Sequence, residues 1–298
     1  MHGLGLVRIV FILLNFAAEI MRNKIDFDLK ALQRECLKIM DLFDGVCRAH
    51  GLRYYMACGT MLGAVRHKGF IPWDDDVDLY MPRPDYDRLC RHSTEWLPAN
   101  LKLCNQDTDI TFPHYFGKVE DISTTFVERS YLGHYSGAWI DIFPIDGAPE
   151  NEAERKRHIR RFKRWRRMQY YVYRNPWKHG HNFGGAFVWL LQKFYSKRYV
   201  NQRLQKVVRE YGFDDHDLLM PHNDKQKTFT KETLGVKPVE YEFEGRKFYG
   251  VKDYDKYLTT IFGDYMTPPP EDKRVVHHSI EYCDMNLPIA EYIKGKGE

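Results

Sequence analysis

The chain has 298 residues, of which 43% are hydrophobic and 29% are charged, and its formal net charge at pH 7 is +4. A chain of this length can bury a large core, and the composition is that of an ordinary globular protein. The small net charge gives no ground for nucleic-acid binding. None of the six cysteines forms a Cys-x-x-Cys pair, which indicates reduced thiols rather than a zinc knuckle or a disulfide framework.

The first 25 residues are expected to form an extension ahead of the folded core. Residues 4–18 are mostly apolar but shorter than the roughly 20 residues that span a bilayer, and no small-residue cleavage pattern follows them. A packed or disordered extension, a membrane-surface anchor and a cleaved signal are the three alternatives. After this stretch, apolar residues recur at helical spacing from Leu29 to Cys47 and predict a helix that ends near Gly51.

A short strand followed by a glycine turn is predicted next. Residues 52–58 read as the strand, and the turn at Gly59 opens a short helix with Thr60 near its N-cap. Backbone N–H groups at such a turn are ready ligands for an anion. A basic loop follows and offers cations that grip phosphates, although three basic residues on a loop suit exposed surface equally well. These residues are Arg66, His67 and Lys68.

Four aspartates then fall within five positions, at Asp74, Asp75, Asp76 and Asp78. Carboxylates this close repel one another and need a compensating cation. Residues 76–81 alternate polar and apolar like a half-buried strand, so Asp76 and Asp78 project from one face with Cα atoms roughly 6.6 Å apart. This arrangement predicts a site for Mg²⁺, or for Mn²⁺ in its place, with Asp74 and Asp75 as secondary ligands.

Solvated surface is the competing explanation for an acidic loop. Apolar residues on both sides of the acids indicate a partly buried segment instead, and they are Ile71, Trp73, Val77 and Leu79. Trp73 is suited to stack on a base or on a choline-like cation, and core packing explains it as well. A phosphate-binding turn followed by paired carboxylates on a strand is the arrangement that a nucleotidyltransferase-type site requires.

Two further candidates follow a helix predicted over residues 86–96. Residues 113–128 suit a hairpin that carries Lys118, a candidate phosphate ligand, and residues 137–142 suit a core strand that carries Asp141. Asp141 is the candidate third carboxylate, because an unpaired acid on an apolar strand is costly; a salt bridge to a basic neighbour is the alternative. Asp146 reads as a turn former.

The second half of the chain contains a strongly basic helix. Residues 155–174 include ten Lys or Arg and no acid, with an apolar residue every three or four positions. A solvated face, an anionic membrane surface and a phosphorylated glycan all suit such a helix, and no nucleic-acid reading module accompanies it. A helical run over 186–211, a hairpin over 239–251 and a helix from Asp253 to Phe262 are predicted after it, with His277 and His278 as weaker site candidates.

Residues 59–78 resemble the signature of the LicD family almost without interruption. This family is related to fukutin and falls within the nucleotidyltransferase superfamily. Residues 116–118, 139–147 and 263–270 are similar to its later landmarks. The resemblance implies a transferase that moves phosphocholine, or a related phospho-group, from a CDP-activated donor to a cell-surface glycan or glycolipid, as in lipopolysaccharide, capsule or teichoic acid.

The order of elements and the resemblance together predict an α/β (α+β) fold, with a nucleotidyltransferase-like mixed sheet flanked by helices and an additional helical segment. We expect an extension over residues 1–25, a catalytic core over 26–150, a basic helical segment over 151–212, and a hairpin and helix over 213–298 that complete the domain. A cytoplasmic location, with association to the inner face of the membrane as an added hypothesis, fits this reaction. In the inferred mechanism Asp76, Asp78 and Asp141 are catalytic.

Two other functions compete with this one. A glycosyltransferase also uses an Asp-x-Asp pair to hold a metal and a nucleotide-sugar diphosphate. The glycine turn upstream of the acids argues against it. A non-catalytic module that binds a glycan or a lipid is the second alternative, and the complete set of carboxylates argues against that one.

Overall fold

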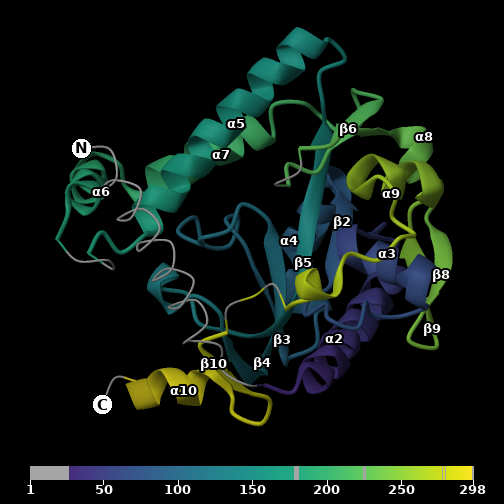
Figure 1. Ribbon diagram of the computed structural model, residues 1–298, viewed down its shortest axis with the longest axis horizontal. Coiled ribbons are helices and arrows are strands. Elements are labelled where there is room, and N and C mark those ends of the chain that lie inside the picture. Colours follow the sequence, from purple (N-terminus) through teal and green to yellow (C-terminus); the bar gives the residue numbers. More distant parts are fainter. Residues whose placement is uncertain (1–26, 178–180, 224–225, 277, 279, 297–298) are drawn as a thin grey trace, which may run out of the picture.

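The computed structural model describes residues 27–177, 181–223, 226–276, 278 and 280–296. The expected extension over residues 1–25 and the candidate His277 lie outside these ranges. Within them, a mixed ten-stranded sheet runs through the centre and helices pack around it (Figure 1). The predicted α/β class is confirmed.

Helix α2 (Leu29–His50) matches its prediction closely. The side chain of Asp28 accepts a hydrogen bond from the Ala31 N–H, and Gly51 ends the helix in the left-handed conformation with φ 61°. The predicted apolar face is buried, and α2 packs across β5 (Ser136–Gly147). Helical periodicity was sufficient to place this element because most of its apolar residues lie on one stripe, with Leu42 as an exposed exception.

The sheet has the strand order β10-β4-β5-β2-β1-β9-β8. Its other strands on this path are β1 (Tyr55–Met56), β2 (Asp78–Pro82), β4 (Gly117–Val127), β8 (Val239–Phe243), β9 (Arg246–Gly250) and β10 (Tyr282–Asp284). Strand β3 (Leu101–Cys104) pairs with β4, while β6 (Leu218–Met220) and β7 (Phe229–Thr230) extend the end of β5. The β2–β5 and β1–β9 pairs are parallel. Strands from both ends of the chain therefore share one sheet.

The first strand is shorter than predicted. Strand β1 has only two residues, because helix α3 (Cys58–His67) already begins at Cys58 with Ala57 as its N-cap. Thr60 is the third residue of that helix and not a residue near its N-cap. Asp76 precedes strand β2, which begins only at Asp78.

Two local predictions in the middle of the chain are wrong. Residues 113–128 do not form a hairpin, because β4 is one long strand that pairs antiparallel with β5, and a bulge between Asp121 and Phe126 interrupts its register. Asp146 is not in a turn. It lies on β5, where its carboxylate accepts hydrogen bonds of 2.8 and 2.7 Å from the buried Arg83 guanidinium.

The remaining helices follow the predicted order with two changes. Helix α4 (Arg83–Trp96) begins three residues early, and the run expected over 186–211 is divided into α6 (Phe183–Phe194) and α7 (Lys197–Val208), with Ser196 as the N-cap of α7. The basic helix α5 (Glu152–Tyr173), the β8–β9 hairpin and helix α9 (Tyr254–Phe262) confirm their predictions. The short α8 (Lys231–Leu234) and α10 (Ile289–Lys296) were not predicted. No helix in the described ranges is long and apolar enough to span a bilayer.

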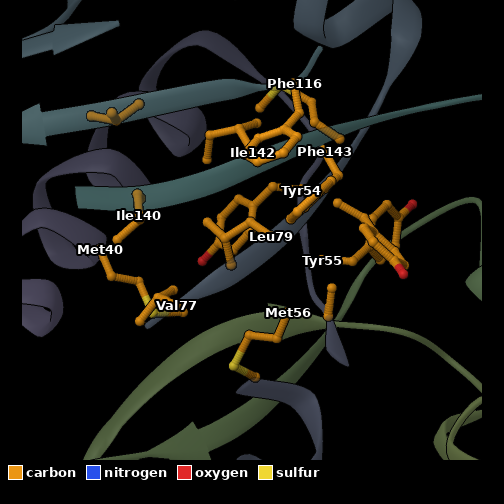
Figure 2. Close-up of a cluster of buried hydrophobic side chains, with 14 of the residues drawn as sticks. Met40, Tyr54, Tyr55, Met56, Val77, Leu79, Phe116, Ile140, Ile142 and Phe143 are labelled. Carbon is orange, nitrogen blue, oxygen red and sulfur yellow. The ribbon is translucent and has the colours of Figure 1, made fainter. Parts of the chain in front are cut away.

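The apolar core lies between the sheet and the helices. Ile140, Ile142 and Leu79 on the central strands are fully buried, together with Met40 of α2 (Figure 2). The side chains that alternate with them on these strands, Asp78 and Asp141, point away from this cluster into a cavity. The same strands therefore carry the core on one face and the acidic residues on the other.

Candidate active site

A cavity of about 800 Å³ opens above the central strands. Asp78 comes from β2, Asp141 from β5 and Lys118 from β4, while Asp74 and Asp76 come from the loop before β2. Cys58 and Gly59, at the N-terminal end of α3, also line it. All of the predicted metal ligands except Asp75 thus line a single cavity.

The strand register brings the charged side chains together. Asp78 lies opposite Asp141 in the parallel β2–β5 pair, and Lys118 lies opposite Asp141 in the antiparallel β4–β5 pair. Lys118 is buried, and its Nζ is 2.9 Å from Asp141 Oδ1 and 3.9 Å from the centre of the Trp139 ring. The proposed third carboxylate therefore has the salt bridge that was its alternative explanation, and it also faces the cavity.

Contacts from helices α2 and α3 hold the acidic loop. Gln33 of α2 donates a hydrogen bond of 2.8 Å to the backbone oxygen of Asp74. Gly59 lies directly against the Asp74 side chain, since a Cβ atom on Gly59 would be 2.5 Å from Asp74 Oδ2. Thr60 lies outside the cavity lining, and its hydroxyl accepts a hydrogen bond of 2.8 Å from the Asp78 N–H. The Gly-Thr pair thus positions two of the acids.

His278 binds the loop from the C-terminal side. Its backbone N–H donates to Asp75 Oδ2 at 3.0 Å, and its ring Nδ1 and Nε2 lie 3.1 Å from Asp75 Oδ1 and 4.0 Å from Asp76 Oδ2. Burial alone would lower the pKa of His278, but the hydrogen bond to Asp75 and the charge of Asp76 raise it to about 9. His278 is therefore a cation, and it holds Asp75 outside the cavity lining.

The carboxylates of the cavity have raised pKa values because they are buried close to one another. Burial raises the pKa of Asp74 to about 8, with further contributions from Asp76 and Asp75. Burial also raises the pKa of Asp76 to about 6, partly offset by His278. The pKa of Asp78 lies well above its usual range because of burial and the charges of Asp76 and Asp141. Lys118 and His278, cations that contact these acids, carry less charge than Asp74, Asp76, Asp78 and Asp141 together.

A divalent cation fits this imbalance. Oxygen atoms of Asp74, Asp75 and Asp76 lie within 4.8 Å of one another, and Asp78 and Asp141, which lie opposite each other in the sheet, line the same cavity as Asp74 and Asp76. Carboxylate oxygens are the ligands that Mg²⁺ and Mn²⁺ accept, and a dication would offset both the burial and the mutual repulsion that raise the pKa values of these acids. The chemistry of the donor set therefore matches a hard metal ion.

Of the other predicted substrate ligands, two line the cavity and two lie outside it. Arg66 lines the cavity, where its guanidinium donates to the backbone oxygen of Tyr265 at 2.8 Å, and burial and the nearby Arg274 lower its pKa. Trp73 also lines the cavity, with the Arg274 guanidinium 5.4 Å from the centre of its ring. His67 and Lys68 lie at the end of α3, outside the cavity lining.

Several ionisable residues of the cavity were not predicted from the sequence. They are His114, Glu128, Arg129, Arg166, Asp264 and Lys273. Arg166 belongs to the basic helix α5, so this helix contributes to the cavity wall. Local features of the sequence mark three of these positions. Lys273 stands in the Lys-Arg pair that precedes the histidines, Asp264 lies in the family-like stretch 263–270, and Arg166 lies in the basic helix. The places of His114, Glu128 and Arg129 in the cavity follow only from the fold.

Comparison with known proteins decides the family. The model of the LicD/FKTN/FKRP nucleotidyltransferase domain matches residues 51–179. The lipopolysaccharide cholinephosphotransferase LicD of Haemophilus influenzae is 32% identical over 270 residues, which cover 84% of this chain and 96% of that protein. The chain belongs to the LicD family. All of the cavity carboxylates except Asp264 lie within the matched domain.

The match to other members of the LicD family is shorter. The ribitol 5-phosphate transferase FKRP of Mus musculus is 57% identical over 35 residues, or 12% of this chain and 7% of that protein. The ribitol-5-phosphate transferase FKTN of Mus musculus is 28% identical over 116 residues, or 39% of this chain and 22% of that protein. The names of all three relatives describe transferases of a phosphate-containing group.

Proposed function

We propose that this LicD-family phosphotransferase moves a phosphocholine-like group from a CDP-activated donor to a hydroxyl of a cell-surface glycan or glycolipid, with Mg²⁺ or Mn²⁺ as cofactor. The observation that carries the proposal is the cluster of buried carboxylates beside Lys118 in one cavity. The name of the Haemophilus influenzae relative supports phosphocholine as the group and lipopolysaccharide as the acceptor class. The two ribitol phosphate transferases support a related phospho-polyol as the alternative group.

In this mechanism Asp74, Asp76 and Asp78 would hold the metal, Asp141 is kept as the proton acceptor beside them, and Asp75 supports Asp76 through His278. When bound, the metal supplies charge neutralisation on the leaving nucleotide. Lys118 and Arg66 bind donor phosphate oxygens, Lys118 as a buried point charge and Arg66 through two guanidinium N–H groups. The N-terminal end of α3 at Gly59 offers backbone N–H groups to the same anion.

The transfer step is an in-line displacement. The acceptor oxygen forms a bond to the donor phosphorus nearest the transferred group, and the bond between that phosphorus and the oxygen of the nucleotide breaks, so that CMP leaves. The hydroxyl proton passes to a carboxylate of the cavity, for which Asp141 is our candidate. Lys118, which lies 2.9 Å from it, stabilises the ionised form that accepts the proton.

The wall of the cavity suits a charged donor and acceptor. Trp73 offers a ring face for the base or for a choline-like cation. Arg129 and Arg166 offer cations to phosphates of the acceptor, and Arg166 joins the cavity to the basic helix α5. We propose that the reaction takes place on the cytoplasmic side, where the glycolipid acceptor brings the enzyme to an anionic membrane surface.

A panel of CDP-activated donors tests the proposal. The purified protein is incubated with CDP-choline, CDP-ethanolamine, CDP-glycerol and CDP-ribitol, with Mg²⁺ or with a chelator, and CMP is measured. We expect one donor to release CMP, and we expect this release to require the metal. When acceptor is added, the product should contain a phosphodiester. A glycosidic product from a nucleotide sugar would establish the glycosyltransferase alternative. Absence of turnover on all donors, with binding of glycan or lipid retained, would establish the non-catalytic one.

A further inference from the structure

Helix α6 carries an apolar stripe that faces away from the protein. Phe183, Phe187, Leu190 and Phe194 recur at intervals of four, three and four residues, which places them on one side of the helix. Their exposed fractions are 97%, 54%, 50% and 76%. These four residues are called the α6 stripe below. Large apolar side chains aligned in this way and left in water mark an interaction surface.

The opposite side of α6 fixes the orientation of the stripe. Val188 is 3% exposed, and Gly185 approaches the chain so closely that a Cβ atom there would be 2.4 Å from the Pro176 oxygen. Gln192 donates hydrogen bonds of 2.9 and 2.8 Å to the backbone oxygens of Tyr171 and Arg174 at the end of α5. The α6 helix is therefore docked on α5 by its inner face, and its apolar outer face points outward.

The surroundings of the stripe are strongly basic. Residues 155–209, which include α5 after its first three residues and all of α6 and α7, contain seventeen Lys or Arg and no Asp or Glu. These three helices lie together at one side of the sheet (Figure 1). Lys193 of α6 lies beside the stripe, with its Nζ 5.2 Å from the centre of the Trp189 ring. Trp189 is itself 45% exposed and flanks the stripe.

Only one kind of partner matches both features. Two copies of the chain facing each other through α6 would bring the same cations together, which opposes self-association. Nucleic acid would use the cations but not an apolar stripe of phenylalanine and leucine. An anionic bilayer surface accepts both, because phenylalanine and leucine enter the boundary between head groups and acyl chains while lysine and arginine contact the lipid phosphates.

We propose that the α6 stripe inserts into the surface of an anionic membrane, with the cations of α5 and Lys193 contacting the head groups. The basic helix alone predicts only electrostatic attraction. The stripe adds an apolar contact that lies in the plane of the interface and that persists at high salt. The reason for docking rests on the proposed function, because a glycolipid acceptor is embedded in such a membrane surface. The docking itself needs neither donor nor acceptor.

Co-sedimentation of the full chain with vesicles tests the proposal. The vesicles contain phosphatidylglycerol and phosphatidylethanolamine, with phosphatidylcholine vesicles as the neutral comparison. The test variant is Phe183→Ser/Phe187→Ser/Phe194→Ser. The control variant replaces three exposed apolar residues of other elements, Leu42→Ser/Val236→Ser/Ile293→Ser, which are 41%, 73% and 46% exposed. We expect the parent and the control to bind the anionic vesicles. The partition coefficient of the test variant should be lower by about tenfold or more.

Two readouts separate insertion from charge attraction. Brominated lipids should quench the fluorescence of the bound parent, and Trp189→Phe, which keeps an aromatic side chain, should bind equally but lose part of that quenching. Arg160→Gln/Arg164→Gln/Arg167→Gln, on exposed positions of α5, should weaken binding most at low salt. Release of CMP in solution should be the same for all of these variants and the parent, so its loss would speak to the proposed function and not to docking.

Equal binding of the test variant and the parent would overturn the proposal and assign the membrane contact to other residues, such as the apolar residues 4–18. Absence of vesicle binding by the parent would overturn it as well. If the parent then forms dimers in light scattering and the test variant does not, a second copy of the chain covers the stripe.

Discussion

Replacing Lys118 by Met should reveal how much of the stability of the site depends on one buried cation. Lys118 is 4% exposed, and its Nζ lies 2.9 Å from Asp141 Oδ1 among four carboxylates of the cavity. Methionine has a similar volume and keeps the aliphatic contact with Trp139, so the substitution removes the charge with little loss of packing. Asp141 is then left buried without its cation.

The size of the effect follows from that distance. Two unit charges 2.9 Å apart attract by about 6 kcal/mol at an effective dielectric constant of 20. Burial of the ammonium group offsets part of this attraction, and removal of one member of a buried pair costs roughly 3 to 5 kcal/mol. A domain is stable by roughly 5 to 15 kcal/mol, so the variant should fold but unfold at a much lower urea concentration.

Urea unfolding of the parent, Lys118→Met and the control Lys102→Met measures this loss. Lys102 is exposed on the neighbouring β3, so its variant should change the free energy of unfolding by less than about 0.5 kcal/mol. The double variant Lys118→Met/Asp141→Asn should recover about half of the loss, because it removes the unpaired charge. The reasoning is refuted if Lys118→Met loses no more than its control, or if the double variant is less stable than Lys118→Met.

Two other predictions concern the acidic loop and a buried histidine pair. Gly59→Ala should displace Asp74 and weaken Mg²⁺ binding about tenfold in calorimetry. The control Gly45→Ala on α2, where no atom lies within 4 Å of the added Cβ, should bind Mg²⁺ as the parent does. Equal affinities of Gly59→Ala and the parent would exclude Asp74 as a metal ligand. Burial lowers the pKa of His158 and His222 in the folded protein, so the free energy of unfolding falls as the pH drops below about 6.5. His222→Asn should therefore lose less stability than the parent between pH 7 and pH 5. Urea unfolding that shows the same pH dependence for both proteins would contradict this.

Local patterns were enough to predict several elements. The apolar stripe of α2 and the glycine that ends it are both visible in the sequence, as are the Glu244-Gly245 turn between β8 and β9 and the Asp253 cap of α9. Four carboxylates of the cavity, Asp74, Asp76, Asp78 and Asp141, were also predicted, because the cost of burying several like charges identifies a site before the fold is known. The metal-binding role of those carboxylates stays a prediction.

Other features depend on contacts that the sequence does not display. Residues 113–128 read as a hairpin, but the Asp121 carboxylate accepts hydrogen bonds from the N–H and hydroxyl of Ser123 at a bulge, and β4 continues beyond it as one strand. Asp146 read as a turn former because its partner, Arg83, is 63 residues away. Arg129 and Arg166 reach the cavity only through the packing of distant segments, whereas His278 was a weaker candidate from the sequence and does line the cavity.

Turnover of the Asp78→Asn variant tests the central claim most directly. Asp78 faces Asp141 across the β2–β5 pair and lines the cavity, and the exchange keeps its shape but removes its charge. With the best CDP-activated donor and saturating Mg²⁺, CMP release should fall on the order of 10³-fold or more, while the stability holds or rises as repulsion among the carboxylates is relieved. The exposed Asp214→Asn should release CMP at the parent rate. Near-normal release by Asp78→Asn would contradict a carboxylate-bound metal in the transfer reaction.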